Sequence, residues 1–139
     1  MAYDPTNIFA RIVRGEIPCV RVYEDADTLA FMDLMPQSEG HTLVIPKVAG
    51  ENLFDTPPGS VAAAILSTQR VARAVKAAFS PPGLIVTQFN GPAAGQTVFH
   101  LHFHIIPRYD GVPVAGHGGA RMANPDELAA LAKMIAAGI

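Results

Sequence analysis

A histidine stands at every second position of the stretch Phe99-His100-Leu101-His102-Phe103-His104-Ile105-Ile106-Pro107-Arg108. The residues between the histidines are apolar, and a period of two is that of a β-strand, whose side chains alternate between its two faces. A strand here would place three imidazoles on one face, about 6.6 Å apart along the strand, and would bury the apolar residues on the other face. Because Pro107 cannot donate a hydrogen bond to a neighbouring strand, we expect the strand to end near it.

The three histidines admit three interpretations. A polar face in water is the weakest, because Lys, Glu or Thr serve that purpose and nothing in it requires one titratable ring three times. As metal ligands, two histidines at alternate strand positions could share one zinc ion. As catalytic groups, one imidazole would act as nucleophile or general base, while its neighbours fix its tautomer and handle the proton.

The residues just before the histidines favour an anion as the ligand. Residues 90–98 read Asn-Gly-Pro-Ala-Ala-Gly-Gln-Thr-Val, and the Asn-Gly pair indicates a turn. Gly91 and Gly95 allow the backbone to approach a ligand closely. A loop of small residues entering a strand can direct successive N–H groups at an anion, and Thr97 adds a hydroxyl. A phosphate-sized ligand beside three imidazoles suits this composition better than a bare metal ion does.

Residues 95–108 (GQTVFHLHFHIIPR) resemble the signature of the histidine triad (HIT) superfamily of nucleotidyl hydrolases and transferases. The His-x-His-x-His core is only moderately specific, but the flanking Ala-Gly-Gln-Thr-Val and Ile-Pro-Arg make the match highly specific. The resemblance covers the chain as far as residue 110 and is less diagnostic in the tail. Further matching stretches are Ile8-Phe9 with Ile12, Gly15-Glu16-Ile17-Pro18, Phe31-Met32-Asp33 and 40–47 (GHTLVIPK).

Length and composition limit the class of protein. The chain has 139 residues, which suits a single domain over 1–139, with its core at 5–110 and a C-terminal loop and helix at 111–139. It is 50% hydrophobic with a mean hydropathy of +0.26, so we expect a partner subunit to cover part of its surface. The net charge of −2, without a basic run, argues against binding of nucleic acid. No apolar run indicates a membrane span or a signal peptide, and the single cysteine, Cys19, excludes an internal disulfide and favours a cytoplasmic location.

Hydrophobic periodicity and turn residues predict an α+β fold. A short helix is expected at 4–13, capped by Asp4 or Thr6, and a final helix is expected after Asn124. Between them, a long helix at 60–79 should be capped by Ser60 and should bury Val61, Ile65, Ala72, Val75 and Phe79. Strands are predicted at 20–24, 28–34, 41–45, 84–89 and 99–108, and a mobile loop with a solvent-facing His117 at 110–123. The resemblance implies a HIT-like fold, an antiparallel sheet of about five strands with one long helix and short terminal helices, assembled as a homodimer.

The resemblance also implies an activity. The protein would cleave purine nucleoside monophosphate derivatives of the phosphoramidate type, through a nucleotide held covalently on His102. His100 and His104 would orient that ring and bind phosphoryl oxygens, and Thr97 would pass a proton to the leaving group. No metal or other cofactor is expected.

The nucleotide-binding residues are carried over from the same resemblance. Ile8, Phe9 and Ile12 would line the pocket for the base, although their pattern alone suits a core face, and Phe31 is a further nucleotide-binding position. Asp33 would accept hydrogen bonds from the ribose hydroxyls, or else simply cap a turn. His41 is expected to be a secondary site residue close to the triad. The remaining nucleotide-binding positions are Asn90, Gly95, Gln96 and Val98.

Two departures from the family pattern bear on function. Some bacterial relatives hold a structural zinc ion on cysteines beside the Ile8-Phe9 region, and here the matching positions are Asn7 and Ala10, so we expect no zinc there. Relatives also usually carry Asn or Gln where this chain has Phe89, so the substrate preference that the resemblance implies stays open at this position. The alternatives that remain are a diadenosine polyphosphate hydrolase of the same superfamily, a nucleotide-binding adaptor with low turnover, and a metal-binding protein.

Overall fold

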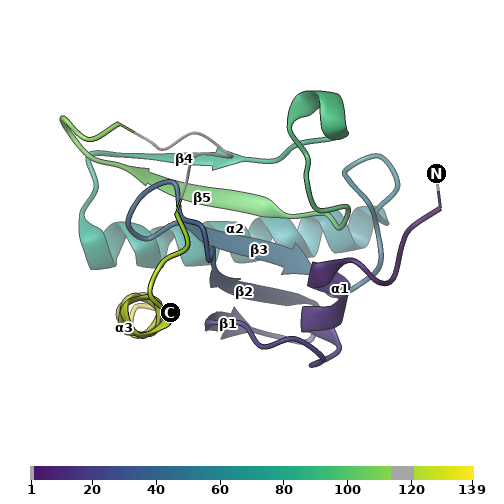
Figure 1. Ribbon diagram of the computed structural model, residues 1–139, viewed down its shortest axis with the longest axis horizontal. Coiled ribbons are helices and arrows are strands. Elements are labelled where there is room, and N and C mark those ends of the chain that lie inside the picture. The colour runs from purple at the N-terminus through teal and green to yellow at the C-terminus, as the bar shows by residue number, and fades with distance from the viewer. Residues whose placement is uncertain (1, 114–120) are drawn as a thin grey trace.

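The computed structural model of the protein describes residues 2–113 and 121–139. Its strands are β1 (Arg21–Glu24), β2 (Thr28–Met32), β3 (Thr42–Pro46), β4 (Gly83–Thr87) and β5 (Phe103–Arg108). Within this part of the chain, the five strands form one antiparallel sheet in the order β1-β2-β3-β5-β4, which confirms the predicted fold class (Figure 1).

Helices lie on both sides of the sheet. The long helix α2 (Pro58–Phe79) runs along one face and contacts β2, β3 and β5. Helix α1 (Ile8–Val13) lies on the opposite side, and α3 (Pro125–Ala136) packs beside β1 and α2 (Figure 1). A short 3-10 helix, η1 (Pro92–Ala94), interrupts the loop between β4 and β5.

Alternation along the central strands builds two separate cores. Side chains of β2 and β3 that point toward α2, such as Met32 and Val44, pack with Val71 and Val75 of that helix. Their neighbours point to the other face and pack around Phe9 of α1; they are Leu29, Phe31, Leu43 and Ile45. Both faces of β2 and β3 are therefore buried, and the second core forms the floor on which the site described below is built.

The first helix begins later than predicted. It starts at Ile8, because Asn7 is its N-cap and the Asn7 side chain accepts a hydrogen bond from the N–H of Ala10. Asp4 instead closes the preceding turn, where it accepts from both the N–H and the hydroxyl of Thr6. The side chains of Asp4 and Thr6 thus hydrogen-bond to each other in the turn before the helix.

Helix α2 differs from the prediction at its start and in its buried face. It begins at Pro58, so Ser60 lies in its first turn and is not its cap. Ile65 was predicted to be buried, but 43% of its surface is exposed. The helix turns small residues to the sheet instead, which allows close approach, and the buried hydroxyl of Ser67 hydrogen-bonds that of Thr28 at 2.7 Å. The buried face consists of Ala64, Ser67, Thr68, Val71, Ala74 and Val75.

The observed ends of three strands differ from the predicted ones, and this leaves several predicted site residues outside the strands. β2 ends at Met32 and β4 at Thr87, each two residues before its predicted end, and β3 begins at Thr42. Asp33, His41 and Phe89 therefore lie just outside the strands and are not part of them.

The largest difference concerns the histidine stretch. β5 begins at Phe103, so His104 lies in the strand, whereas His100 and His102 lie in the irregular segment before it. The predicted face of three strand histidines is therefore wrong, although the alternation persists: Leu101 and Phe103 still pack against Ala64 of α2.

The pairing partner of this stretch explains where the strand begins. The ladder between β3 and β5 stops at the pair Val44 and Phe103. Before that pair, the N–H of Leu101 donates to the carbonyl of Gly50, in the loop after β3, at 2.9 Å. β5 ends at Arg108, one residue after Pro107, as expected: the ladder with β3 already stops at Ile105, and the ladder with β4 stops at Arg108.

No helix in residues 2–113 or 121–139 is long and apolar enough to cross a membrane. The predicted mobile loop at 110–123 contains residues 114–120, so His117 lies outside the described residues.

Candidate active site

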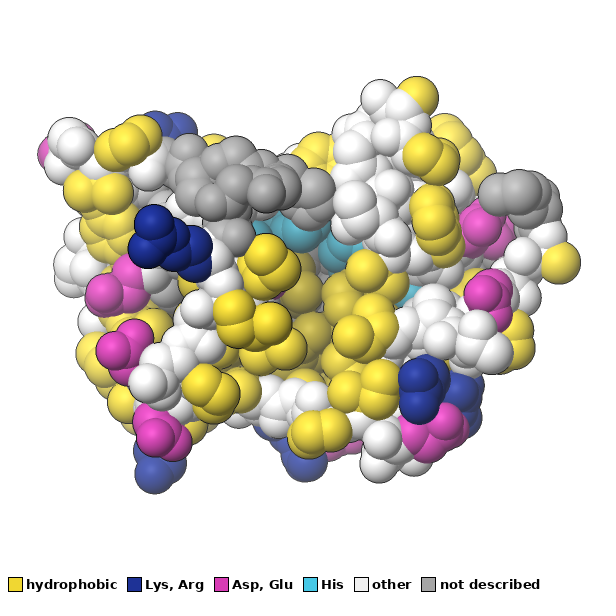
Figure 2. Space-filling model, in the orientation of Figure 1, with side chains coloured by type: hydrophobic (Ala, Val, Ile, Leu, Met, Phe, Trp, Pro, Cys, Tyr) yellow, Lys and Arg dark blue, Asp and Glu magenta, His cyan; other side chains and the backbone are white. Residues whose placement is uncertain are grey.

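A cavity of about 450 Å³ opens on the side of the sheet opposite α2, in the size range of small-molecule sites. Figure 2 shows histidine side chains in a hollow of this face, beside a group of hydrophobic side chains. Residues far apart in the sequence meet here. The predicted site residues that line it are Ile8, Phe9, Ile12, Phe31, Asp33, Thr97, Val98, His102 and His104.

The register of the sheet brings the apolar and the polar parts of the cavity together. Phe31 pairs with Leu43, and Leu43 pairs with His104. Paired residues on neighbouring antiparallel strands point to the same face, so His104 stands in one row with the apolar floor. Leu43 and Cys19 also line the cavity, and neither was predicted from the sequence. Leu43 reaches the cavity through strand pairings that the sequence alone does not define.

His102 is held in one tautomer. Its Nδ1 lies 2.7 Å from the main-chain oxygen of His100. A carbonyl can only accept, so Nδ1 carries the proton and Nε2 keeps its lone pair. The ring is 6% exposed, and it meets the ring of Phe9 edge-on, with centroids 4.9 Å apart. These contacts fix both the protonation and the orientation of the imidazole at the cavity.

His100 supports His102 from behind. Its Nε2 donates to the carbonyl of Pro46 at 2.7 Å, and its Nδ1 lies 2.6 Å from the hydroxyl of Tyr3. Burial lowers the pKa of His100, partly offset by the hydrogen bond to Pro46, so the ring is neutral at neutral pH. Because both ring nitrogens have partners within the protein, this geometry favours an orienting role, through the main-chain carbonyl, over direct contact with a ligand.

His104 receives its tautomer through a second buried histidine. The N–H of Gln37 donates to Nδ1 of His41 at 3.0 Å. His41 must then carry its proton on Nε2, which lies 3.0 Å from Nδ1 of His104 and 3.4 Å from Oδ2 of Asp33. His104 accepts at Nδ1 and therefore carries its own proton on Nε2. The chain of hydrogen bonds turns His104 into a donor, which is what binding of a phosphoryl oxygen requires.

Asp33, His41 and His104 also form a candidate metal group, because their ligand atoms lie within 4.8 Å of one another. Zinc binds the unprotonated nitrogen of a neutral imidazole. In His41 that nitrogen is Nδ1, which faces the N–H of Gln37, whereas the nitrogen nearest the other two residues carries the proton. The group does not fit a metal ion while the Gln37 hydrogen bond is in place. At the positions that the resemblance compares with zinc ligands, the side chain of Asn7 accepts from the N–H of Ala10 and caps α1.

Other predicted residues shape the loop before the triad. The side chain of Gln96 donates to the carbonyls of Glu51 and Val98 and accepts from the N–H of Gly91. Asn90 accepts from the N–H of Leu53 at 2.9 Å. These side chains are not among those that line the cavity, so their contribution is to hold the loop that presents Thr97 and Val98.

Two further features of this loop concern the space around His104. Gly95 has φ +105°, a conformation that residues with a side chain rarely adopt. The ring centroid of Phe89, where the resemblance implies an amide, lies 5.5 Å from that of His104. The amide is thus replaced by an aromatic ring in contact with a triad member.

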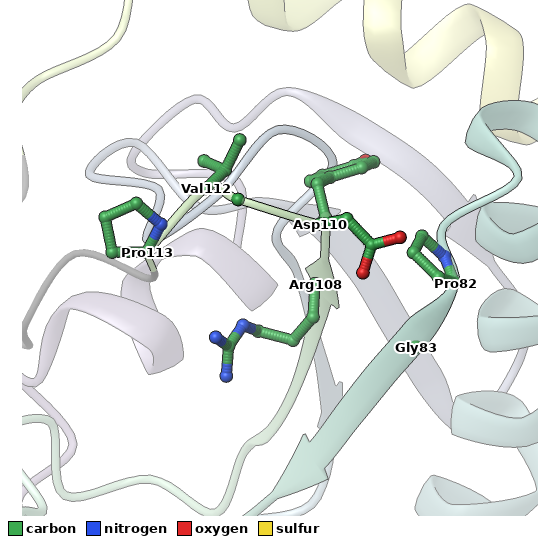
Figure 3. A pocket seen from close by; sticks show the side chains of 8 residues that line it. Pro82, Gly83, Arg108, Asp110, Val112 and Pro113 are labelled. Atoms are coloured by element: carbon green, nitrogen blue, oxygen red, sulfur yellow. The ribbon is translucent and has the colours of Figure 1, made fainter.

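A second cavity lies at the other end of β5, with a volume of about 600 Å³, between Pro82, Gly83 and residues 108–113 (Figure 3). It contains the side chains of Arg108 and Asp110. Arg108 is five residues along the strand from Phe103, or about 16 Å. The one cation next to the histidine stretch therefore belongs to a different cavity from His102.

The hydrogen bonds predict the tautomers of four histidines. Spectra that correlate the ring nitrogens of ¹⁵N-labelled histidine with ring protons, at pH about 8 where imidazole is neutral, should show Nε2–H for His41, His100 and His104 and Nδ1–H for His102. The His41→Gln variant retains a donor and should leave His104 as it is, whereas His41→Ala should not. An Nδ1–H signal from His104 in the unaltered protein would contradict the hydrogen-bond chain.

Comparison with known proteins places these features in a family. The HIT domain model matches residues 14–111. Protein hit of Bacillus subtilis is 40% identical over 132 residues, which cover 93% of this chain and 91% of the relative. An adenosine 5'-monophosphoramidase of Schizosaccharomyces pombe is 38% identical over 133 residues, covering 95% and 97%. The crystal structure of a Hit-like protein from Bartonella henselae involved in cell-cycle regulation, with an unknown ligand, superposes with a TM-score of 0.92 at 49% identity, covering 99% of this chain and 100% of that chain. A family model that spans most of the chain, and relatives covered almost end to end, show that this protein belongs to the HIT family.

Proposed function

We propose that the protein hydrolyses purine nucleoside monophosphates joined to an amine, through a nucleotide held covalently on His102. One observation carries the proposal: the carbonyl of His100 accepts from Nδ1–H of His102, so the lone pair of this imidazole is on Nε2, and the residue lines a cavity together with His104. The monophosphoramidase from S. pombe supports this substrate class, because it is 38% identical over nearly the whole chain.

The reaction would proceed in two displacements. In the first, Nε2 of His102 attacks the α-phosphorus, an N–P bond forms, and the bond to the leaving nitrogen breaks. The electron pair stays on the departing amine, which takes a proton from Thr97 or from a water molecule. In the second, water attacks the phosphorus, the N–P bond breaks, and the proton that the water loses restores the proton donor of the first step, so that the nucleoside monophosphate leaves and His102 is neutral again. Two easier steps replace one difficult step, and a neutral imidazole is a good nucleophile at cell pH.

The surrounding groups would stabilise the charge that develops. Nδ1–H of His102 becomes more acidic once Nε2 bonds to phosphorus, so the hydrogen bond to the His100 carbonyl strengthens in the intermediate. Nε2–H of His104 and the main-chain N–H groups near Thr97 and Val98 would donate to the phosphoryl oxygens. Donors that are fixed before the reaction need not reorganise during it.

The rest of the cavity suits a nucleoside. Its apolar wall, formed by Ile8, Phe9, Ile12 and Phe31, offers a slot for a purine. Asp33 caps the turn after β2 by accepting from the N–H of Met35, and its carboxylate also lines the cavity, where it could accept from ribose hydroxyls. The two roles proposed for Asp33 from the sequence are therefore compatible.

The His102→Ala variant tests the covalent mechanism. We expect it to lose nearly all turnover of an adenosine phosphoramidate while still binding AMP, because the nucleophile is lost and the apolar wall is not. The His104→Ala variant should lose about 10²- to 10⁴-fold in turnover rate, as is usual for an acid–base or orienting group.

Turnover is measured under multiple- and single-turnover conditions, and the adenylylated protein is sought by mass spectrometry after rapid acid quench. More than a tenth of the activity left in His102→Ala would exclude the mechanism, and binding without labelling of the unaltered protein would indicate an adaptor.

The charge of the cavity should determine the leaving group. A dinucleoside polyphosphate brings several negative charges, yet no Lys or Arg is among the described residues that line the cavity of His102, and Arg108 lies in the other cavity. We therefore expect kcat/KM for an adenosine phosphoramidate to exceed that for diadenosine tri- or tetraphosphate on the same preparation. A tenfold preference for the polyphosphate, about 1.4 kcal/mol in transition-state binding, would instead support the diadenosine polyphosphate hydrolase.

A homodimer with its sheets side by side is the proposed assembly. β4 is the last strand in the sheet order, and an open edge is normally covered. Val86 on this strand is 45% exposed. Light scattering should give twice the 14.7 kDa chain mass, and Val86→Glu should shift the mass toward the monomer. The matched control is Met134→Glu, since Met134 is 49% exposed on α3 beside β1, at the opposite edge. A monomeric unaltered protein, or a dimer equally sensitive to both substitutions, would contradict this arrangement.

A further inference from the structure

Tyr3 reaches the triad from the far end of the sequence. Its hydroxyl lies 2.6 Å from Nδ1 of His100, 97 residues away. The two rings meet edge-on, with centroids 5.7 Å apart and planes inclined by 64°. Neither the function proposed above nor the sequence patterns assign a role to this tyrosine.

The direction of this hydrogen bond follows from the other side of the ring. Nε2 of His100 faces the carbonyl of Pro46, which can only accept, so the neutral imidazole carries its proton there. Nδ1 is then an acceptor, and Tyr3 must be the donor. Burial raises the pKa of Tyr3, so its hydroxyl keeps the proton that it donates.

We infer that Tyr3 is a positioning residue for the nucleophile: by clamping the ring of His100 between two hydrogen bonds, it fixes the main-chain carbonyl that holds Nδ1–H of His102. The inference rests on the proposed function in taking His102 as the nucleophile. His100 is 1% exposed, so water cannot easily replace the phenol, and a buried acceptor left without its donor is unfavourable. With the clamp open, the imidazole can rotate and its carbonyl can move with the backbone.

The same segment also fixes the other support of His102. The main-chain N–H and the side-chain amide of Asn7 both donate to the carbonyl of Asp4, next to Tyr3. Asn7 in turn caps α1, and α1 carries Phe9, whose ring lies against that of His102. Residues 3–7 therefore connect a hydrogen bond on one side of the nucleophile with a ring contact on the other.

The Tyr3→Phe variant isolates the hydroxyl, because it keeps the ring contact. We expect kcat for an adenosine phosphoramidate to fall about three- to tenfold, the factor that one neutral hydrogen bond is worth. KM should stay within about twofold, since Tyr3 does not line the cavity. In the ¹⁵N spectra, Nδ1 of His100 should shift toward the value of an unbonded acceptor, and the Nδ1–H signal of His102 should broaden. Tyr109→Phe is the control: Tyr109 is also a half-buried tyrosine, its hydroxyl donates to the carbonyl of Glu39 at 2.8 Å, and its loss should change none of these quantities.

The outcomes separate this inference from the proposed function. If the unaltered protein does not turn over the phosphoramidate, the function fails, and the spectra of His100 and His102 still test the clamp. If the unaltered protein is active and Tyr3→Phe leaves kcat within twofold, the inference is wrong. It is also wrong if kcat falls while both histidine signals stay unchanged, or if the loss is carried by KM, because either result would show a general loosening of the N-terminal segment. Equal thermal midpoints for the two Tyr→Phe variants would establish that a fall in kcat does not come from unfolding.

Discussion

Four imidazoles are buried in one small region of this protein, and burying a polar ring is costly unless it is hydrogen-bonded. His41, His100, His102 and His104 are each at most 6% exposed. Their partners are mainly groups of fixed polarity: the carbonyls of Pro46 and His100 can only accept, and the N–H of Gln37 can only donate. The need to satisfy buried nitrogens therefore also decides where each proton sits. The same hydrogen bonds therefore stabilise the buried rings and determine which ring nitrogen of each histidine can donate or accept.

Two histidines of the histidine stretch line the cavity, but only part of the stretch is a strand. The period of two in residues 99–108 predicted a strand, and it did place His102 and His104 on the cavity side and Leu101 and Phe103 on the α2 side. It could not show that the ladder begins only at Phe103, because that depends on where β3 ends and its following loop turns back to bind Leu101. An alternating pattern predicts which face of the chain each side chain occupies. An extended segment can show this alternation even where it is not hydrogen-bonded to a neighbouring strand.

Contacts between distant segments were beyond prediction from one sequence. Tyr3 with His100, and Gln37 with His41, join a ring to a group from another part of the fold or from a local turn, and neither Tyr nor Gln carries a distinctive pattern in the sequence. Residues with a local signature were predictable: Asn124 does cap α3 by accepting from the N–H of Asp126, as the Asn-Pro-Asp-Glu order indicated. The buried face of α2 lies between these cases. The predicted buried face of this helix was rotated relative to the observed one. The prediction looked for large apolar side chains, but small and hydroxyl-bearing residues face the sheet.

Phe89 shows how a departure from the family pattern can be read physically. An amide at this position would offer hydrogen bonds to a ligand, at the cost of bringing a polar group beside the triad. The phenyl ring instead lies near the ring of His104, with centroids 5.5 Å apart, and adds low-polarity surface beside it. A hydrogen bond from that nitrogen to a phosphoryl oxygen would be made in a less polar environment and would be stronger for it. Phe89 would thus remove a hydrogen bond between an amide and the ligand, and would strengthen the hydrogen bond from His104 to the phosphoryl group. Under the proposed function, selection among leaving groups would then depend less on a hydrogen bond from this position, whereas the groups proposed to bind the phosphoryl oxygens would be retained.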